Sequence, residues 1–68
     1  MPHVPTFSEL EGRRRRLGWS MNELSRATGL SQSKIQRGSL DESERQVAAR
    51  ALVRAEERLL VSLQESIR

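Results

Sequence analysis

Signals for helix ends are the feature of this 68-residue sequence that most constrains its fold. At three places a Ser or Thr precedes a Glu by three residues, each time at the head of an apolar-periodic stretch. These segments span residues 6–9, 20–23 and 39–42. In such a capping box the hydroxyl accepts a hydrogen bond from the third helical amide, and the carboxylate bonds back to the amide of the capping residue. The pattern predicts three helix starts.

Glycines mark the ends of the predicted helices, at positions 18, 29 and 38. Each suits the left-handed backbone conformation that commonly terminates a helix. Ser31 is expected to cap one further short helix, and no segment alternates with the period of two that indicates a strand. We therefore expect an all-α single domain over residues 1–68. Its helices would span about residues 7–17, 21–28, 32–38 and 41–67.

The segment from about 20 to 38 has the organisation of a helix-turn-helix. Its two short predicted helices are joined by Gly29, Leu30 and Ser31, and Leu30 is placed to be buried between them. A glycine-containing turn of this length is typical of the motif that presents its second helix to the major groove of DNA. At about 100° per residue, Ile35 marks the inward face of that second helix and leaves polar side chains outside.

The outward side chains of this helix have the chemistry that DNA reading requires. Gln can bond bidentately to adenine, Arg to guanine, and Ser can donate or accept. The residues expected to read bases are Gln32, Ser33, Gln36 and Arg37. Ser20 begins a helix whose free amides and positive dipole suit a phosphate. The other residues expected to contact phosphates are Ser31, Lys34, Arg15 and Arg16. The alternative interpretation is a polar, solvated helix in an ordinary bundle.

The run from Arg13 to Arg16 cannot face DNA as a whole, because four consecutive helical residues sweep about 300° around the axis. Arg14 falls on the same side as Leu10, inside the predicted buried stripe, so we expect it to make a structural ion pair or hydrogen bond. Arg15 and Arg16 point away from that stripe. Each either reaches a phosphate or stays solvated.

Charge is unevenly distributed along the chain, whose net charge is +3. Residues 1–38 hold seven bases and three acids, 7 − 3 = +4, and residues 39–68 hold five bases and six acids, 5 − 6 = −1. A basic first half fits contact with a polyanion such as a nucleic acid, and a near-neutral second half fits a role other than nucleic-acid contact. A merely solvated surface would show the same charges.

The last predicted helix carries more apolar surface than its own domain can cover. One row of residues is expected to pack on the helix-turn-helix: Ala48, Leu52, Ala55, Leu59 and Leu63. A second row lies beside it, and the two together are wider than a single surface helix needs. We therefore expect a homodimer, with an interface formed by Val53, Leu60, Leu63 and Ile67. The alternative is a helix that frays or folds back on the first helix.

Several function classes are excluded by composition. The chain has no cysteine and one histidine, His3, which excludes disulfide scaffolds and zinc sites built on Cys/His clusters. No nucleophile, acid–base pair or metal cluster can be assembled, so we expect no enzyme and no cofactor. No stretch is suited to a signal peptide or a membrane span. We expect a cytoplasmic protein with no membrane partner and no small-molecule ligand.

About twenty residues resemble the helix-turn-helix core of the phage repressor and Cro-like family. They carry the pattern Gly18-x-Ser20-x-x-Glu23-Leu24-x-x-x-x-Gly29-Leu30-Ser31-x-Ser33-x-Ile35-x-Arg37. The resemblance implies a helical domain that binds a pseudo-palindromic operator as a dimer and controls transcription. It also implies base reading by Gln32, Ser33 and Arg37. Met21 stands where the family usually has Gln, and Gly38 replaces a large apolar residue, which predicts a shorter recognition helix.

The expected function is a dimeric repressor of its own small operon, of the phage, plasmid or anti-CRISPR-associated type, acting at the nucleoid of a bacterial or phage-infected cell. A helix-turn-helix adaptor or antirepressor that binds a protein is the alternative. RNA binding is disfavoured, because the sequence lacks the aromatic stacking surface that single-strand recognition uses.

Overall fold

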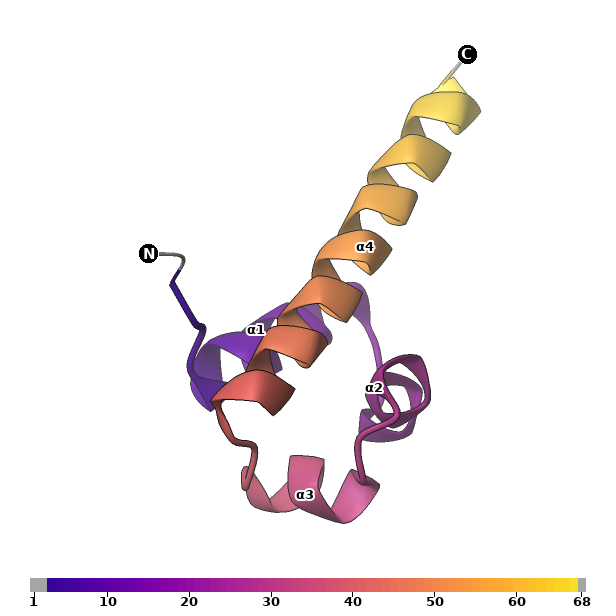
Figure 1. Cartoon of the computed structure of the whole chain (residues 1–68). Coiled ribbons are helices and arrows are strands. Elements are labelled where there is room, and N and C mark those ends of the chain that lie inside the picture. Colours follow the sequence, from indigo (N-terminus) through magenta and orange to yellow (C-terminus); the bar gives the residue numbers. More distant parts are fainter. Residues whose placement is uncertain (1–2, 68) are drawn as a thin grey trace.

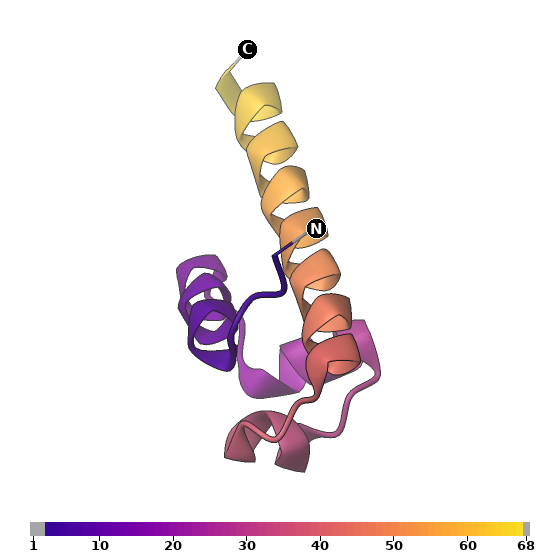
Figure 2. The same cartoon turned by 60° about the vertical axis from the view of Figure 1, so that its left-hand side comes forward.

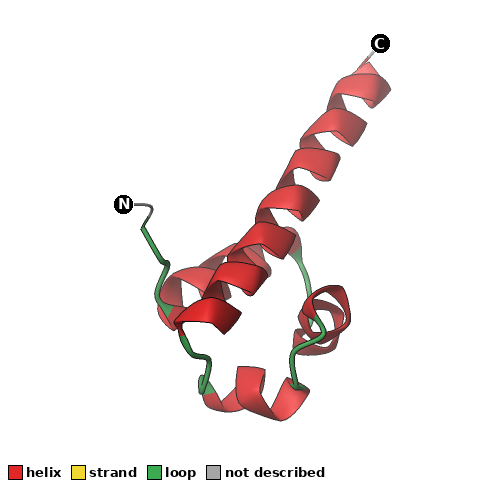
Figure 3. Cartoon of the chain, in the orientation of Figure 1, coloured by secondary structure: helices red, strands yellow, loops and turns green. Residues whose placement is uncertain are grey.

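Four α-helices make up the computed structural model, which describes residues 3–67 apart from the side chain of Ile67. They are α1 (Phe7–Leu17), α2 (Met21–Thr28), α3 (Gln32–Arg37) and α4 (Glu42–Ile67). Short loops connect them, and the described residues contain no strand (Figure 3). The all-α prediction is confirmed, and the helix bounds agree with it to within one residue.

The core lies where α1, α2 and α3 meet the first half of α4. The buried apolar side chains are Leu10, Leu24, Ile35, Leu40, Ala48 and Leu52. Phe7, Trp19 and Leu30 are partly buried against them, so both aromatic side chains belong to the core. α4 packs on α1 and α2, and α2 packs on α3. α3 lies at one end of the molecule, and α4 projects from the other (Figures 1 and 2).

Two of the three predicted capping boxes form in part. Thr6 Oγ1 accepts from the Glu9 amide at 3.2 Å, and Ser20 Oγ accepts from the Glu23 amide at 3.1 Å. The carboxylates do not bond back to the cap amides as the motif predicts. Glu9 Oε2 instead lies 3.1 Å from His3 Nε2, and Glu23 Oε1 accepts from Ser20 Oγ at 3.4 Å. The hydroxyl half of the prediction is therefore confirmed and the carboxylate half is wrong.

The third predicted box, at Ser39, is wrong by two residues. Asp41 caps α4 instead: its Oδ1 accepts from the Glu44 amide at 2.8 Å, and its own amide donates to Glu44 Oε1 at 3.1 Å. The Ser39 amide is already used, because it donates to the Lys34 carbonyl at 3.0 Å and closes the end of α3. Leu40 lies between the end of α3 and the cap of α4 and is buried in the core.

Ser31 occupies the predicted cap position of α3, but its side chain makes no capping hydrogen bond, so the prediction is confirmed in position only. Side chains of α2 hold the turn instead. Ser25 Oγ donates to the Leu30 carbonyl at 2.6 Å, and Thr28 Oγ1 accepts from the Leu30 amide at 3.2 Å.

The glycine ends are confirmed, with left-handed φ values of 75°, 76° and 69° at positions 18, 29 and 38.

The predicted packing row on α4 is wrong in its outer part, although the exposure of Leu63 agrees with the surplus apolar surface that the sequence also predicted. Leu59 and Leu63 are 49% and 51% exposed, and the buried part of the row stops near Ala55. The reason is length: at about 1.5 Å per residue, α4 is about 39 Å long and α1 only about 17 Å. Residues 57–66, the projecting half of α4, are exposed throughout.

Candidate nucleic-acid interface

α3 is anchored in the core by one buried side chain. Ile35 is fully buried among the core residues, and its amide donates to the Ser31 carbonyl at 3.1 Å. At the other end, the Gly38 amide donates to the Ile35 carbonyl at 3.2 Å. This single anchor orients the helix, because the rest of its side chains are exposed.

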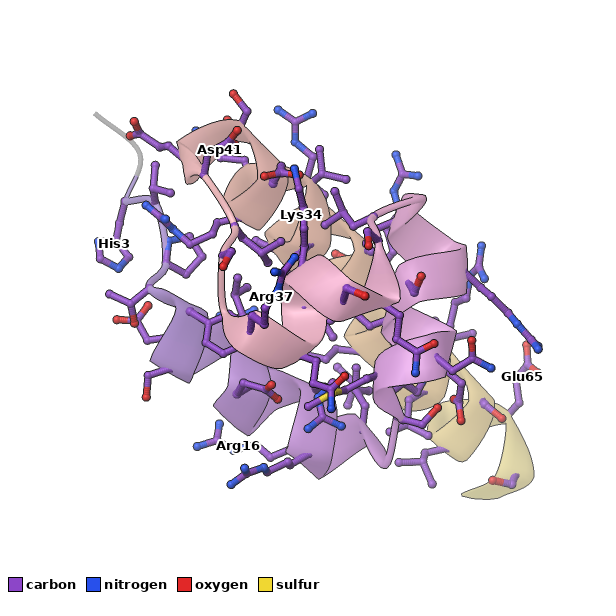
Figure 4. All side chains as sticks on the ribbon, turned by 90° about the horizontal axis from the view of Figure 1, so that it is seen from below. His3, Arg16, Lys34, Arg37, Asp41 and Glu65 are labelled. Carbon is purple, nitrogen blue, oxygen red and sulfur yellow. The ribbon has the colours of Figure 1, made fainter. Side chains whose placement is uncertain are left out.

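The four predicted base-reading residues lie together on this exposed helix. Gln32, Ser33, Gln36 and Arg37 are all solvent-accessible. The Arg37 side chain runs along α3, with Nε donating to the Ser33 carbonyl at 3.3 Å. Seen from below, Arg37 and Lys34 lie at the front of the molecule (Figure 4). The exposure and grouping of these residues agree with the prediction, and base reading itself stays a prediction.

The predicted phosphate contacts are exposed but do not form one cluster. They are Ser20, Ser31, Lys34, Arg15 and Arg16. Arg16 lies at the margin of the view from below, away from α3 (Figure 4). Lys34 Nζ is already paired with Glu44 Oε2, at 3.1 Å. Acidic groups therefore border α3 on the side of α4, and a phosphate at Lys34 would compete with Glu44.

Arg14 has the structural role expected from its place in the buried stripe. Its Nε donates to Glu11 Oε2 at 2.6 Å and its Nη1 to the Trp19 carbonyl at 2.6 Å. Only 12% of the side chain is exposed. Arg13 Nη1 lies 3.6 Å from Glu56 Oε1 and links α1 to α4. The arginine run is thus divided between structural and exposed positions.

The roles of one single arginine and of one row of three arginines on α4 were not identified from the sequence. Arg45 donates from Nε to the Pro5 carbonyl at 3.1 Å and from Nη1 to the Leu40 carbonyl at 2.8 Å, which ties both flanking segments to α4. Arg50, Arg54 and Arg58 line a groove beside α4. Their four-residue spacing was a signal for a shared helix face, whereas nothing local in the sequence indicates the partners of Arg45.

The residues predicted to form a dimer interface are exposed wherever they are described. Val53 is 38% exposed and Leu60 59%, and Leu63 lies on the same projecting half of α4. The side chain of Ile67 lies outside the described residues.

Over the described residues, none of the helices combines the length and apolar character needed to cross a membrane. The same part of the chain contains no group of three His, Cys, Asp or Glu side chains placed to hold a metal ion. Comparisons with protein-family models, with curated proteins and with solved structures found no match. The resemblance of residues 18–37 to phage repressors therefore stays a prediction.

Proposed function

We propose that this protein is a sequence-specific regulator that reads the major groove of double-stranded DNA with α3. The observation that carries the proposal is the division of α3 into one fully buried anchor, Ile35, and an exposed set of Gln, Ser and Arg side chains. Such side chains can discriminate base pairs, and the major groove, about 12 Å wide, admits an α-helix. A helix that served only to complete a bundle would not need this composition.

The bound form is proposed to be a homodimer that represses its own small operon, of the phage, plasmid or anti-CRISPR-associated type. The exposed apolar residues on the projecting half of α4 offer a surface for a second copy. α3 and this projecting half lie at opposite ends of the molecule (Figures 1 and 2). Two copies joined side by side through parallel α4 helices would therefore present both α3 helices to one DNA duplex.

The dimensions of the chain fit this arrangement. Its Cα atoms extend over 42 × 30 × 18 Å. Two copies placed side by side would separate their α3 helices by a distance of the same order as one turn of DNA, about 34–36 Å, which is the usual spacing of half-sites. An antiparallel α4 pair would put the two α3 helices at opposite ends and could not read adjacent half-sites.

Selection from a pool of random DNA duplexes tests the proposal. The expected result is enrichment of an inverted repeat whose half-sites are about 10 base pairs apart from centre to centre. Footprinting on the DNA upstream of the protein's own gene then tests autoregulation. A pool that yields no enriched sequence, at low and moderate salt alike, would contradict DNA reading and favour the adaptor alternative.

A further inference from the structure

A groove runs beside α4, on the side where α4 faces the end of α1 and the end of α2. Its apolar lining, here called the floor, consists of Leu17, Trp19, Ala27, Val47, Ala51, Ala55 and Leu59. Its rim carries Arg50, Arg54 and Arg58. We call this feature the α4 groove. None of its residues belongs to α3 or to the predicted DNA contacts.

The arginine rim is a row of positive charge, and Glu57 lies beside two of its members, Arg54 and Arg58, in a neighbouring hollow. The three side chains are four residues apart on one helix, so their Cα atoms follow one another at about 6 Å along α4. All three are exposed, and the ion pairs found over the described residues involve none of them. Like charges at this spacing destabilise a helix. Carboxylates from a ligand would remove that repulsion.

The floor combines one aromatic ring with small side chains. Trp19 and Ala55 are half-buried and Ala27 is exposed, and the three alanines of the floor leave room for another backbone to approach closely. The α4 residues lining the groove extend from Val47 to Leu59, a length of about 18 Å or three helical turns. A ligand of that length would place one apolar face on the floor and one edge along the arginines.

We propose that the α4 groove binds an acidic amphipathic helix of a partner protein, whose carboxylates pair with Arg50, Arg54 and Arg58. This site is independent of DNA reading by α3. Binding a helix by its apolar face in a groove is a common recognition mode, and the arginines would select an acidic one. DNA phosphates would use the arginines but would gain nothing from the apolar floor.

A second copy of the chain matches the groove less well. Its projecting half offers Glu57 and Glu65, eight residues apart, which could meet two of the three arginines. It would also bring its own Arg58 toward the rim. A separate partner with three carboxylates at four-residue spacing satisfies the whole row.

The test uses two synthetic 14-residue helical peptides without tryptophan. Both carry leucines on one face. In one peptide three glutamates at four-residue spacing lie beside the leucines, and in the other peptide three lysines take the same positions. Trp19 is the single tryptophan of the chain and lies in the floor, so its fluorescence reports binding at this site. We expect the glutamate peptide to cause a saturable blue shift and to protect Trp19 from acrylamide, and the lysine peptide to do neither.

Substitutions of the three rim arginines test whether the peptide binds through them. The triple change Arg50→Gln, Arg54→Gln and Arg58→Gln should weaken binding of the glutamate peptide about tenfold, which is within reach of three exposed ion pairs. Changing the same three arginines to Glu should transfer binding to the lysine peptide. The matched control removes the same charge elsewhere, through Arg15→Gln, Arg16→Gln and Arg26→Gln, and should bind the glutamate peptide as before.

Three outcomes would overturn the proposal. The two peptides could bind equally, which would mean unselective apolar adhesion. A duplex DNA could displace the glutamate peptide from the wild-type protein but not from the Arg37→Ala variant, which would place the peptide on α3. Loss of self-association in the triple Gln variant, with no peptide binding to the wild type, would make the groove a contact between copies. The Arg37→Ala variant should still bind the glutamate peptide. Peptide binding in the α4 groove can therefore be judged even if the protein does not read DNA.

Discussion

Gly38 is restricted both by its backbone and by a neighbouring side chain. Its φ of 69° lies in the left-handed region, and a Cβ atom added there would lie 3.1 Å from Cδ2 of Phe7. Gly29 has a similar φ of 76°, but an added Cβ would meet nothing within 4 Å. An alanine at either position would have a strained backbone, but only an alanine at position 38 would also crowd a neighbouring side chain.

Gly38→Ala should lower the free energy of unfolding by more than Gly29→Ala. The left-handed conformation alone costs an alanine about 1–2 kcal/mol, and only the Gly38 variant must also displace the Phe7 ring. Urea unfolding followed by Trp19 fluorescence measures both variants. Equal losses would show that Phe7 moves aside without cost.

Arg37→Ala should weaken binding to the selected operator by about 1–3 kcal/mol and relax the preference at one base pair. Repeating the random-duplex selection with the variant measures both effects. Ser62→Ala, an exposed polar truncation on α4 about 160° around the helix from Leu60, serves as the control and should leave affinity and preference unchanged. Weaker binding with an unaltered preference would make Arg37 a phosphate contact rather than a base reader.

Glu44→Gln should strengthen DNA binding, because it releases Lys34 from its ion pair. The glutamine can still accept from the Asp41 amide, so the cap of α4 is kept. The Lys34 side chain of this ion pair is 47% exposed, so we expect the free energy of DNA binding to improve by only about 0.2–1 kcal/mol. Titration of one operator at several salt concentrations measures it. If affinity is unchanged, Lys34 does not contact a phosphate.

At the scale of the elements, Arg14 connects the end of α1 to the start of α2. Arg14→Ala should lower the free energy of unfolding by about 1.5–3 kcal/mol, the range for hydrogen bonds to charged groups, because the Trp19 carbonyl and Glu11 lose their donor. The neighbouring exposed Arg15→Ala should change it by less than about 0.5 kcal/mol. Thermal and urea unfolding compare the two. Similar losses would contradict a special role for Arg14.

At the scale of the whole molecule, the projecting half of α4 is the proposed dimer contact. Leu60→Gln together with Leu63→Gln should shift sedimentation toward the monomer and weaken operator binding, with helix content retained. Val61→Gln is the matched control, since Val61 is 53% exposed but lies about 100° around α4 from Leu60. Unchanged sedimentation of the double variant would contradict this dimer contact.

Local sequence signals alone determined the helices and the side of α3 that faces the core. The glycines at positions 18, 29 and 38 end helices because each directly follows a helical stretch and can adopt the left-handed conformation without steric cost. The period of the helix likewise places Ile35 inside and Arg37 outside, and it places Arg14 in the buried stripe. These predictions needed no knowledge of which elements meet.

Only the tertiary structure decided features that depend on which surfaces meet in space. The Ser39 amide closes the end of α3, which leaves Asp41 to cap α4. Surplus apolar surface on α4 was expected from the sequence, but the packed chain fixed where it begins: burial stops near Ala55, and Leu59 is 49% exposed. The α4 groove exists because the end of α1, α2 and α4 converge beside three arginines of one helix. A local pattern shows which face of a helix is apolar, but only the packed chain shows how much of that face is covered.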